Sequence, residues 1–267
     1  MNEFTYSDNI PTDDMGCLYG FSLFETFLVN KNGSVFLLGE HIDRIYNSMN
    51  FFNFDINMTK GEFELVILRY IESNQVKDKV LRVSVTYGNK SKGIRPSTLI
   101  TCRDNPYNNE ACLKGYKLTV SKYKKNENSP IIQHKTANYL ENFLANQNAV
   151  HEGFDDAVFL NTKNKITETT RSNIFFISKG TLHTPNIECG ILPGIIRGWI
   201  IEKAASLGIK CRQGRYPLKM LLESDEIFIA NSVMGIMPVY CVDNYIISSI
   251  LPGKITSLFI SEYQNVI

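Results

Sequence analysis

The sequence predicts an α+β fold with two domains, each of which mixes helices and strands. The chain has 267 residues, 43% of them hydrophobic, which is enough for two buried cores. Segments with an apolar residue at every second position are interleaved with segments of helical spacing. A polar stretch from Arg103 to Glu110, which includes Pro106, is typical of a connection between domains.

The first part of the chain predicts a hairpin followed by two helices. Residues 23–38 contain two short apolar runs around Asn32-Gly33, a dipeptide that accepts the positive φ angles of a tight turn. Residues 40–54 carry apolar side chains at helical spacing. Thr59 and Glu62 are spaced as a capping box, so a second helix should begin there and run to about residue 73.

A pair of strands and a linker complete the first predicted domain. Apolar and polar residues alternate along 79–87, as expected of a strand with one face in water, and 97–102 is its predicted partner. We therefore predict a small N-terminal α/β domain at 1–104, a linker at 105–114 and a C-terminal domain at 115–267.

The second domain is also predicted to mix helices and strands. Pro193 lies just before its last predicted helix, and Gly208 is placed to end that helix. The predicted strands are 116–121, 156–160, 174–177 and 226–230, and the predicted helices are 138–151 and 195–207.

The composition argues against several classes of protein. The net charge of +1 gives no field that would favour nucleic acid or an anionic membrane, so a small-molecule partner is expected. No basic and apolar leader begins the sequence, and no apolar window is long enough to span a membrane, which predicts a cytoplasmic protein. The six cysteines form no Cys-x-x-Cys pair and the four histidines have no metal-pair spacing, so no metal site is predicted.

Three segments of the second half carry residues that could do chemistry. Leu192-Pro193-Gly194-Ile195-Ile196-Arg197 would begin a helix whose N–H groups suit an anion. Glu168 lies in a polar run that leads into a buried strand, and Lys135 precedes an amphipathic helix. Taken singly, these features would be an ordinary helix start, a solvated carboxylate and a surface lysine.

Together, these segments resemble the fold-type-IV pyridoxal-phosphate enzymes, the class IV aminotransferase family. Two further motifs support the resemblance, Tyr19-Gly20-x-x-Leu23-Phe24-Glu25-Thr26 and His41-x-x-Arg44-Ile45, and it extends from about residue 16 to residue 239. The family includes branched-chain aminotransferases, D-amino-acid aminotransferases and aminodeoxychorismate lyases. The resemblance implies the D-amino-acid aminotransferase-like fold, pyridoxal 5'-phosphate as cofactor, a C-terminal domain that binds it, and a homodimer.

The resemblance also implies roles for three charged residues. Lys135 matches the lysine that binds the cofactor covalently and then moves protons, because a desolvated amine can exchange a proton near neutral pH. Glu168 matches the carboxylate that keeps the cofactor's ring nitrogen protonated. Arg44 matches the arginine that grips the cofactor phosphate with its planar fork.

Four more cofactor contacts follow from the resemblance. The backbone N–H groups of Ile195 and Ile196 match phosphate donors at a helix start, although many relatives have threonine at the second position, so only the main-chain contact is implied. Ser232 matches a further hydroxyl on the phosphate side. Tyr139 is expected to place its phenol near the cofactor's ring oxygen or to pack.

Within the family, the sequence looks most like aminodeoxychorismate lyases, which make 4-aminobenzoate and pyruvate for folate synthesis. The segments 19–27, 135–141 and 231–239 carry this likeness, and the last is the most telling, because aminotransferases usually have threonine-rich or glycine-threonine sequences there. Two further departures from the family pattern stand out. Phe21-Ser22 replaces an Asp-Gly or similar pair, and Met237 stands where tryptophan is frequent, which predicts an altered substrate pocket.

Two other functions stay open. The same catalytic residues would serve an aminotransferase acting on branched-chain or D-amino acids with 2-oxoglutarate, since both reactions begin alike. A non-catalytic binding protein of this fold is the second alternative, but the chemistry-bearing residues are all present. An arginine in a polar stretch is usually solvated, so no partner for the substrate carboxylate is predicted among Arg95, Arg171 and Arg215.

Overall fold

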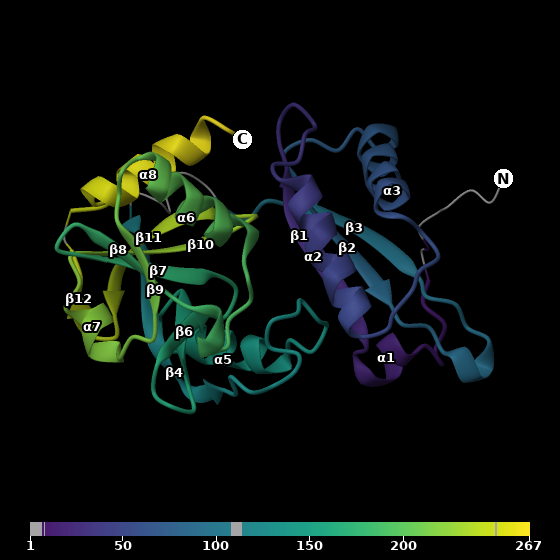
Figure 1. Cartoon of the computed structure of the whole chain (residues 1–267), viewed down its shortest axis with the longest axis horizontal. Coiled ribbons are helices and arrows are strands. Elements are labelled where there is room, and N and C mark those ends of the chain that lie inside the picture. Colours follow the sequence, from purple (N-terminus) through teal and green to yellow (C-terminus); the bar gives the residue numbers. More distant parts are fainter. Residues whose placement is uncertain (1–6, 8, 108–113, 249) are drawn as a thin grey trace. The chain divides into compact units, whose positions relative to one another are not determined.

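Three antiparallel strands organise the first part of the chain in the computed structural model (Figure 1). They are β1 (Ser22–Val29), β2 (Lys79–Thr86) and β3 (Thr98–Asp104), with β2 in the centre. The alternation predicted along 79–87 and its pairing with the strand that follows are confirmed. The structure describes residues 7, 9–107, 114–248 and 250–267.

Helix α2 (Leu38–Phe51) packs on β1, and helix α3 (Lys60–Ser73) packs on α2. The predicted capping box is confirmed, since Thr59 Oγ1 accepts the N–H of Glu62 and the Glu62 carboxylate accepts the N–H of Thr59. A short helix, α1 (Met15–Tyr19), precedes β1, and a 3-10 turn, η1 (Lys90–Lys92), follows β2. The shared core includes Leu23, Phe27, Ile45, Met49, Phe63, Ile67 and Leu81.

The predicted hairpin at 23–38 is wrong in its second strand. The turn exists, with Gly33 at φ +86°, but after it only Val35 pairs with β1, through a single bridge to Val29. The chain then reverses at Leu37, which has φ +56°, and enters α2. Of the apolar residues that suggested a strand, Leu38 is buried in the first turn of α2 and so belongs to the helix instead.

The second part of the chain forms a closed ring of six strands, β4-β5-β6-β7-β10-β11, because β10 pairs with both β7 and β11. The ring encloses an apolar core that includes Val158, Phe176, Ile229 and Met237. Strands β8 and β9 extend the sheet from β7, and β12 pairs with β11. The strand bounds are β4 (Tyr116–Lys125), β5 (Asp156–Asn161), β6 (Ile166–Thr169), β7 (Asn173–Ser178), β8 (Thr181–Pro185), β9 (Cys211–Gly214), β10 (Glu226–Asn231), β11 (Gly235–Val242) and β12 (Tyr245–Ile246).

Helices cover this ring of strands. Helix α5 (Leu140–His151) packs on β4 and β5, while α6 (Ile195–Ser206) and α8 (Lys254–Gln264) pack on β10. The helices predicted at 138–151 and 195–207 are confirmed within two residues, and Gly208 follows α6 at φ +69°. Smaller elements, η2 (Ile187–Cys189) and α7 (Leu218–Leu222), were not predicted, and neither was α8.

The chain divides into two compact units that do not follow the sequence continuously. The first unit contains the described residues up to Pro106 and also His134–Asn138, whereas the second contains the described part of Tyr107–Gln133 and of Tyr139–Val266. Most of the linker predicted at 105–114 lies outside the described residues, so the predicted domain limits stay a prediction.

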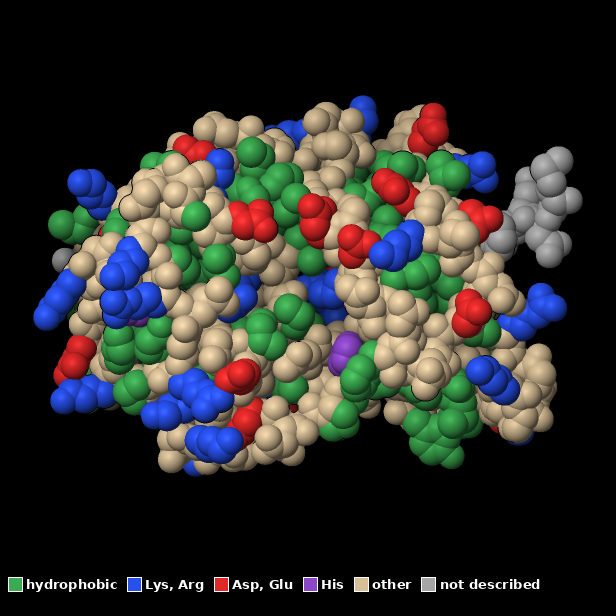
Figure 2. Space-filling model, in the orientation of Figure 1, with side chains coloured by type: hydrophobic (Ala, Val, Ile, Leu, Met, Phe, Trp, Pro, Cys, Tyr) green, Lys and Arg blue, Asp and Glu red, His purple; other side chains and the backbone are tan. Residues whose placement is uncertain are grey.

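The face of the molecule drawn in Figure 2 carries charges of both signs. Basic and acidic side chains both occur across the face in Figure 2, in keeping with the net charge of +1. Among the described residues, no helix combines the length and the apolar character that crossing a membrane requires.

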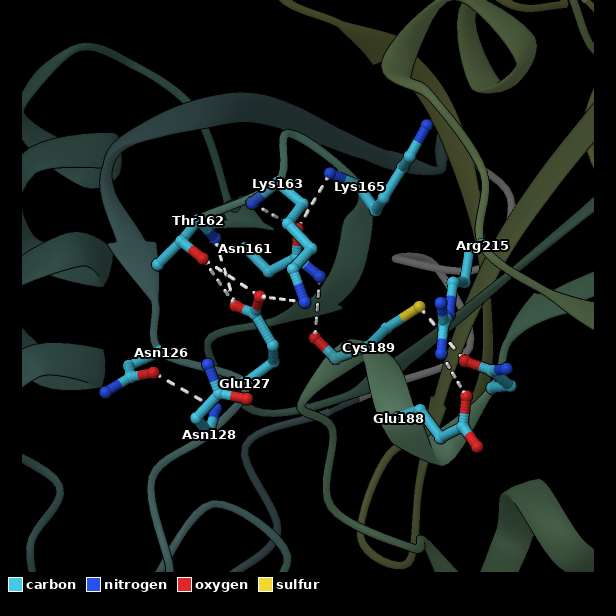
Figure 3. Close-up of polar contacts among 11 residues, drawn as sticks. Asn126, Glu127, Asn128, Asn161, Thr162, Lys163, Lys165, Glu188, Cys189 and Arg215 are labelled. Carbon is cyan, nitrogen blue, oxygen red and sulfur yellow. Dashed lines mark hydrogen bonds and ion pairs between the residues drawn. The ribbon is translucent and has the colours of Figure 1, made fainter.

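The segment that leads from β4 towards Lys135 is anchored at its start by Glu127 (Figure 3). The side chain of Glu127 is 3% exposed and accepts bonds from the hydroxyl and the N–H of Thr162, while Lys163 Nζ lies 3.3 Å from its Oε1. The backbone N–H of Glu127 itself, followed by the Thr162 contacts, lowers the pKa of this carboxyl to about 2. Gly190, at φ +85°, allows the backbone of Glu127 to lie close to its own backbone, since a Cβ at Gly190 would lie 2.7 Å from the Cα of Glu127.

Candidate active site

The first unit holds a buried carboxylate between two basic side chains. Glu25 lies on β1 among core residues and is 2% exposed. Its Oε1 accepts a bond from Arg44 Nε at 2.8 Å, and its Oε2 accepts one from Arg44 Nη2 at 2.6 Å. Burial alone would raise the pKa of Glu25, but the Arg44 charge and the contact with His41 lower it to about 2. Glu25 is therefore ionised at neutral pH, and it was not among the predicted site residues.

His41 holds the same carboxylate from a second direction. Its Nδ1 lies 2.7 Å from Glu25 Oε2, and the ring is 1% exposed. The pKa of His41 is lowered, chiefly by burial and also by the charges of Arg44 and Lys135, although the contact with Glu25 acts to raise it. The ring is thus neutral at pH 7 and donates its Nδ1 proton to Glu25.

Lys135 is fixed through its main chain to the edge of β1. The N–H of Phe24 donates to the carbonyl of Lys135 at 2.9 Å, and the N–H of Ala137 donates to the carbonyl of Ser22 at 2.9 Å. The Nζ of Lys135 lies 4.5 Å from the centre of the Phe24 ring. The backbone of this segment therefore positions a primary amine beside β1, near the charged cluster of Glu25, His41 and Arg44.

Arg82 is a further basic residue at the Phe24 ring, and it was not predicted from the sequence as a site residue. Its guanidinium carbon lies 3.5 Å from the centre of the Phe24 ring, the same ring that Lys135 approaches. The alternation along β2 predicts only that its polar positions face water, and the sequence holds no other signal for Arg82. The three arginines weighed from the sequence lie elsewhere: Arg95 is exposed, Arg171 donates to Asn146, and Arg215 pairs with Glu188.

The second unit places Glu168 at the end of β6, opposite Asn173 at the start of β7. Its Oε2 accepts bonds from Asn173 Nδ2 at 3.0 Å and from the N–H of Leu192 at 3.1 Å. Asn173 also donates to the carbonyl of Leu192 at 3.0 Å. Glu168 is thus joined to the turn before α6 by a fixed network, which a solvated loop carboxylate would lack.

The N-terminus of α6 is built around Gly194. This residue is the N-cap and offers no side chain to the first N–H groups of the helix, among them those of Ile195 and Ile196. Arg197, 5% exposed, fastens this turn to the sheet by donating to the carbonyl of Pro185 and to Gln213. The predicted helix start is confirmed as a geometry in which backbone donors are uncapped.

A buried polar network holds the turn that joins Glu168 to Asn173. Thr170 donates its hydroxyl to Asp156, whose pKa is raised by burial. Asn142 donates to the carbonyl of Thr170 at 2.7 Å, and Lys125 donates to Asn142 at 2.5 Å. The turn is therefore held by buried hydrogen bonds to β5 and α5.

Ser232 and Tyr139 occupy the remaining predicted positions in this unit. Ser232 lies in the loop between β10 and β11, which Asn231 shapes by accepting the N–H groups of Val233 and Met234. Asn231 also donates to Ser172, and Ala230 pairs with Asn173, so this loop begins beside the Glu168 network. Tyr139 is the N-cap of α5.

The predicted site residues thus form two groups, one in each unit. Lys135 and Arg44 lie in the first unit, and Glu168, Ile195, Ile196, Ser232 and Tyr139 lie in the second. Met237 is fully buried in the core of the strand ring, and the altered substrate pocket stays a prediction. Phe21, the other departure, packs in the core of the first unit against Tyr87.

Comparison with known proteins gives a consistent result. A family model described as amino-transferase class IV matches residues 22–241. A "Putative branched-chain-amino-acid aminotransferase" of Methanocaldococcus jannaschii is 32% identical over 260 residues, covering 95% of this chain and 89% of that protein. An "Aminodeoxychorismate lyase" of Bacillus subtilis is 29% identical over 231 residues, covering 84% of this chain and 78% of that protein.

Solved structures show the same fold. A "Putative 4-amino-4-deoxychorismate lyase" from Legionella pneumophila superposes with a TM-score of 0.90 at 25% identity, covering 99% of this chain and 98% of that one. A branched-chain aminotransferase of T.th. with pyridoxamine 5'-phosphate gives a TM-score of 0.89 at 24% identity, covering 97% of this chain and 88% of that one. The predicted α+β fold is confirmed.

Proposed function

The chain belongs to the class IV aminotransferase family, and from this premise we propose that it is an aminodeoxychorismate lyase, which converts 4-amino-4-deoxychorismate to 4-aminobenzoate and pyruvate. It is an enzyme that uses pyridoxal 5'-phosphate, as the family does. The resemblance also supports a homodimer that acts in the cytoplasm on a small amino substrate.

The residues present fit this cofactor by their chemistry. Lys135 offers a primary amine, Arg44 a planar cation suited to a phosphate, and Glu168 a carboxylate suited to a protonated ring nitrogen. Gly194 leaves the first N–H groups of α6 uncapped, which is the arrangement that binds phosphate at helix starts. Ser232 and Tyr139 add two hydroxyls.

These residues have distinct proposed roles. The cofactor, when bound, supplies an aldehyde that takes up the substrate amine and a ring that accepts electrons. Lys135 would hold the cofactor covalently, give up that bond to the substrate, and then take a proton from the substrate carbon with Nζ. Glu168 would keep a positive charge at the ring nitrogen. Arg44, Ile195, Ile196 and Ser232 would hold the phosphate and so fix the ring in place.

The observation that carries the lyase assignment is the segment from Asn231 to Val239, the most telling of the three that resemble the lyases. Asn231 folds the start of this segment into a turn beside the Glu168 network. An aminotransferase for branched-chain or D-amino acids is the second candidate, and the relative with 32% identity, whose name is "Putative branched-chain-amino-acid aminotransferase", favours the branched-chain form. In either case Arg82, which lies beside the Phe24 ring with Lys135, suits a substrate carboxylate.

The test is a direct comparison of substrates. The purified protein, loaded with pyridoxal phosphate, is incubated with enzymatically generated aminodeoxychorismate while the fluorescence of 4-aminobenzoate is followed. D-alanine and L-leucine, each with 2-oxoglutarate, are run in parallel. We expect 4-aminobenzoate to form, whereas keto acid without 4-aminobenzoate would establish the aminotransferase.

A substitution at Gly194 tests the helix start. In Gly194→Ala the new Cβ would lie 2.0 Å from Asn173 Oδ1, so the Asn173 amide must shift, which disturbs the bonds that its Nδ2 donates to Glu168 and Leu192. We expect a loss of about 1–3 kcal/mol in the free energy of unfolding and at least ~tenfold weaker binding of pyridoxal phosphate, measured by thermal unfolding and by absorbance titration.

The matched control is Gly198→Ala in the same helix. A Cβ at Gly198 meets nothing within 4 Å, so alanine there should leave cofactor binding unchanged. It should also stabilise the helix by up to about 1 kcal/mol, because alanine has the higher helix propensity. Equal behaviour of the two variants would contradict the role given to Gly194.

A further inference from the structure

We propose that Glu25 is a positioning residue, which fixes the guanidinium of Arg44 in the orientation that binds the cofactor phosphate. This inference rests on the proposed role of Arg44. An acid on a core strand is ordinarily either neutral or a structural partner, so the sequence alone does not indicate this role. The observations that carry it are the geometry of the pair and its surroundings in the first unit.

The contact between Glu25 and Arg44 is a side-on, two-point pair. Each carboxylate oxygen accepts one bond, from Nε at 2.8 Å and from Nη2 at 2.6 Å. The guanidinium is planar, so two bonds along one edge determine the plane and the direction of its other N–H groups. A single contact would leave the group free to rotate about its long side chain.

Glu25 is in turn prevented from moving. It lies on β1 between Leu23 and Phe27, two residues of the apolar core, and β1 pairs with β2 along its whole length. His41, on α2 one turn before Arg44, donates to Oε2 at 2.7 Å. Among the described residues His41 Nε2 has no hydrogen-bond partner, so the only polar contact that the structure gives this ring is the one that holds Glu25.

The burial of this group makes a purely stabilising role a poor explanation. Glu25 is 2% exposed and the Arg44 side chain 11% exposed, so both charges lose most of their water. A buried ion pair of this kind adds little net stability compared with well-packed apolar side chains of similar volume. An oriented cation for an anionic ligand is something that apolar side chains could not provide.

The experiment measures ligand affinity, not turnover. Apo-protein is titrated with pyridoxal 5'-phosphate and with pyridoxal, which lacks the phosphate, and the two dissociation constants are compared for wild type, Glu25→Gln, Arg44→Gln and the double variant. We expect Glu25→Gln to weaken the binding of pyridoxal phosphate at least ~tenfold and to change that of pyridoxal less than ~twofold. The double variant should bind no more weakly than Arg44→Gln alone, because both changes remove one interaction.

Asp14 provides the matched control. It is a buried carboxylate of the same unit, 0% exposed, which accepts bonds from the N–H of Gly16 and the hydroxyl of Thr86. Asp14→Asn should therefore change both affinities by the same factor. If Glu25→Gln does not fold, Glu25→Asp replaces it, because the shorter side chain keeps the charge but withdraws the carboxylate from Arg44.

The outcomes separate the two proposals. A selective loss in Arg44→Gln without one in Glu25→Gln, or tighter phosphate binding once the Glu25 charge is removed, would overturn the role of Glu25 and leave that of Arg44. Equal weakening of both ligands by Glu25→Gln would also overturn it, since this is the sign of a general structural effect. No selective loss in Arg44→Gln would overturn both.

Discussion

Lys135→Ala is expected to abolish turnover and the visible absorbance of the covalently bound cofactor. Both effects follow because alanine has no amine to form the bond or to move the proton. A general acid–base group contributes roughly 10²–10⁴-fold to a rate, and here the covalent step is lost as well, so we expect a loss at the upper end of that range or beyond. The fold should survive, because the segment is held to β1 by its main chain and not by the lysine side chain.

The measurement is an absorbance spectrum of the purified variant with excess pyridoxal phosphate, followed by the substrate assay. Lys124→Ala is the control, since Lys124 is an exposed lysine whose amine donates to Asn164 in the second unit. An unchanged spectrum in Lys135→Ala would show that another lysine carries the cofactor. Lys125 would then be examined first, because its side chain is buried, although its Nζ is already engaged by Asn142 and Glu141.

The fold was predictable where local signals decide the structure. The capping box at Thr59 and Glu62 and the alternation along β2 depend on neighbouring residues, and both are confirmed. The predicted second strand of the hairpin was wrong because an apolar run such as the one at Val35 suits either a strand or the start of a helix. Here Leu38 packs into the core from the first turn of a helix. Closure of the strand ring by the pairing of β10 with β7 depends on residues about fifty positions apart, and no local pattern contains that information.

In the candidate site too, some residues could be predicted from the sequence and others could not. The chemistry-bearing residues could be found from motifs, because amines, guanidinium groups and carboxylates at fixed spacing are visible in a sequence. The residues that hold these groups in place could not be found from motifs. Asn173 fixes Glu168, and Glu25 fixes Arg44, through contacts that exist only after β6 meets β7 and β1 meets α2. The return of His134–Asn138 to the first unit is likewise a property of the folded chain.

Glu168 is the second residue whose replacement should have a large effect, and the choice of substitution matters. Glu168→Ala would remove the charge and also leave the donors of Asn173 and Leu192 without their acceptor. Glu168→Gln keeps a carbonyl oxygen and the volume, so it isolates the charge. We expect this variant to retain pyridoxal phosphate, because Lys135 and the phosphate contacts are intact.

Proton abstraction in Glu168→Gln should be slower by roughly 10²–10³-fold, because the ring nitrogen loses the partner that keeps it protonated and accepts electrons less well. Stopped-flow spectroscopy with deuterated substrate would locate the effect in that step, since an isotope effect on the observed rate should appear or increase. Glu223→Gln, at an exposed carboxylate at the end of α7, is the control and should behave as wild type. Full activity in Glu168→Gln would mean that the ring nitrogen is paired elsewhere, and the network of Asn173 and Leu192 would then serve only to shape the turn before α6.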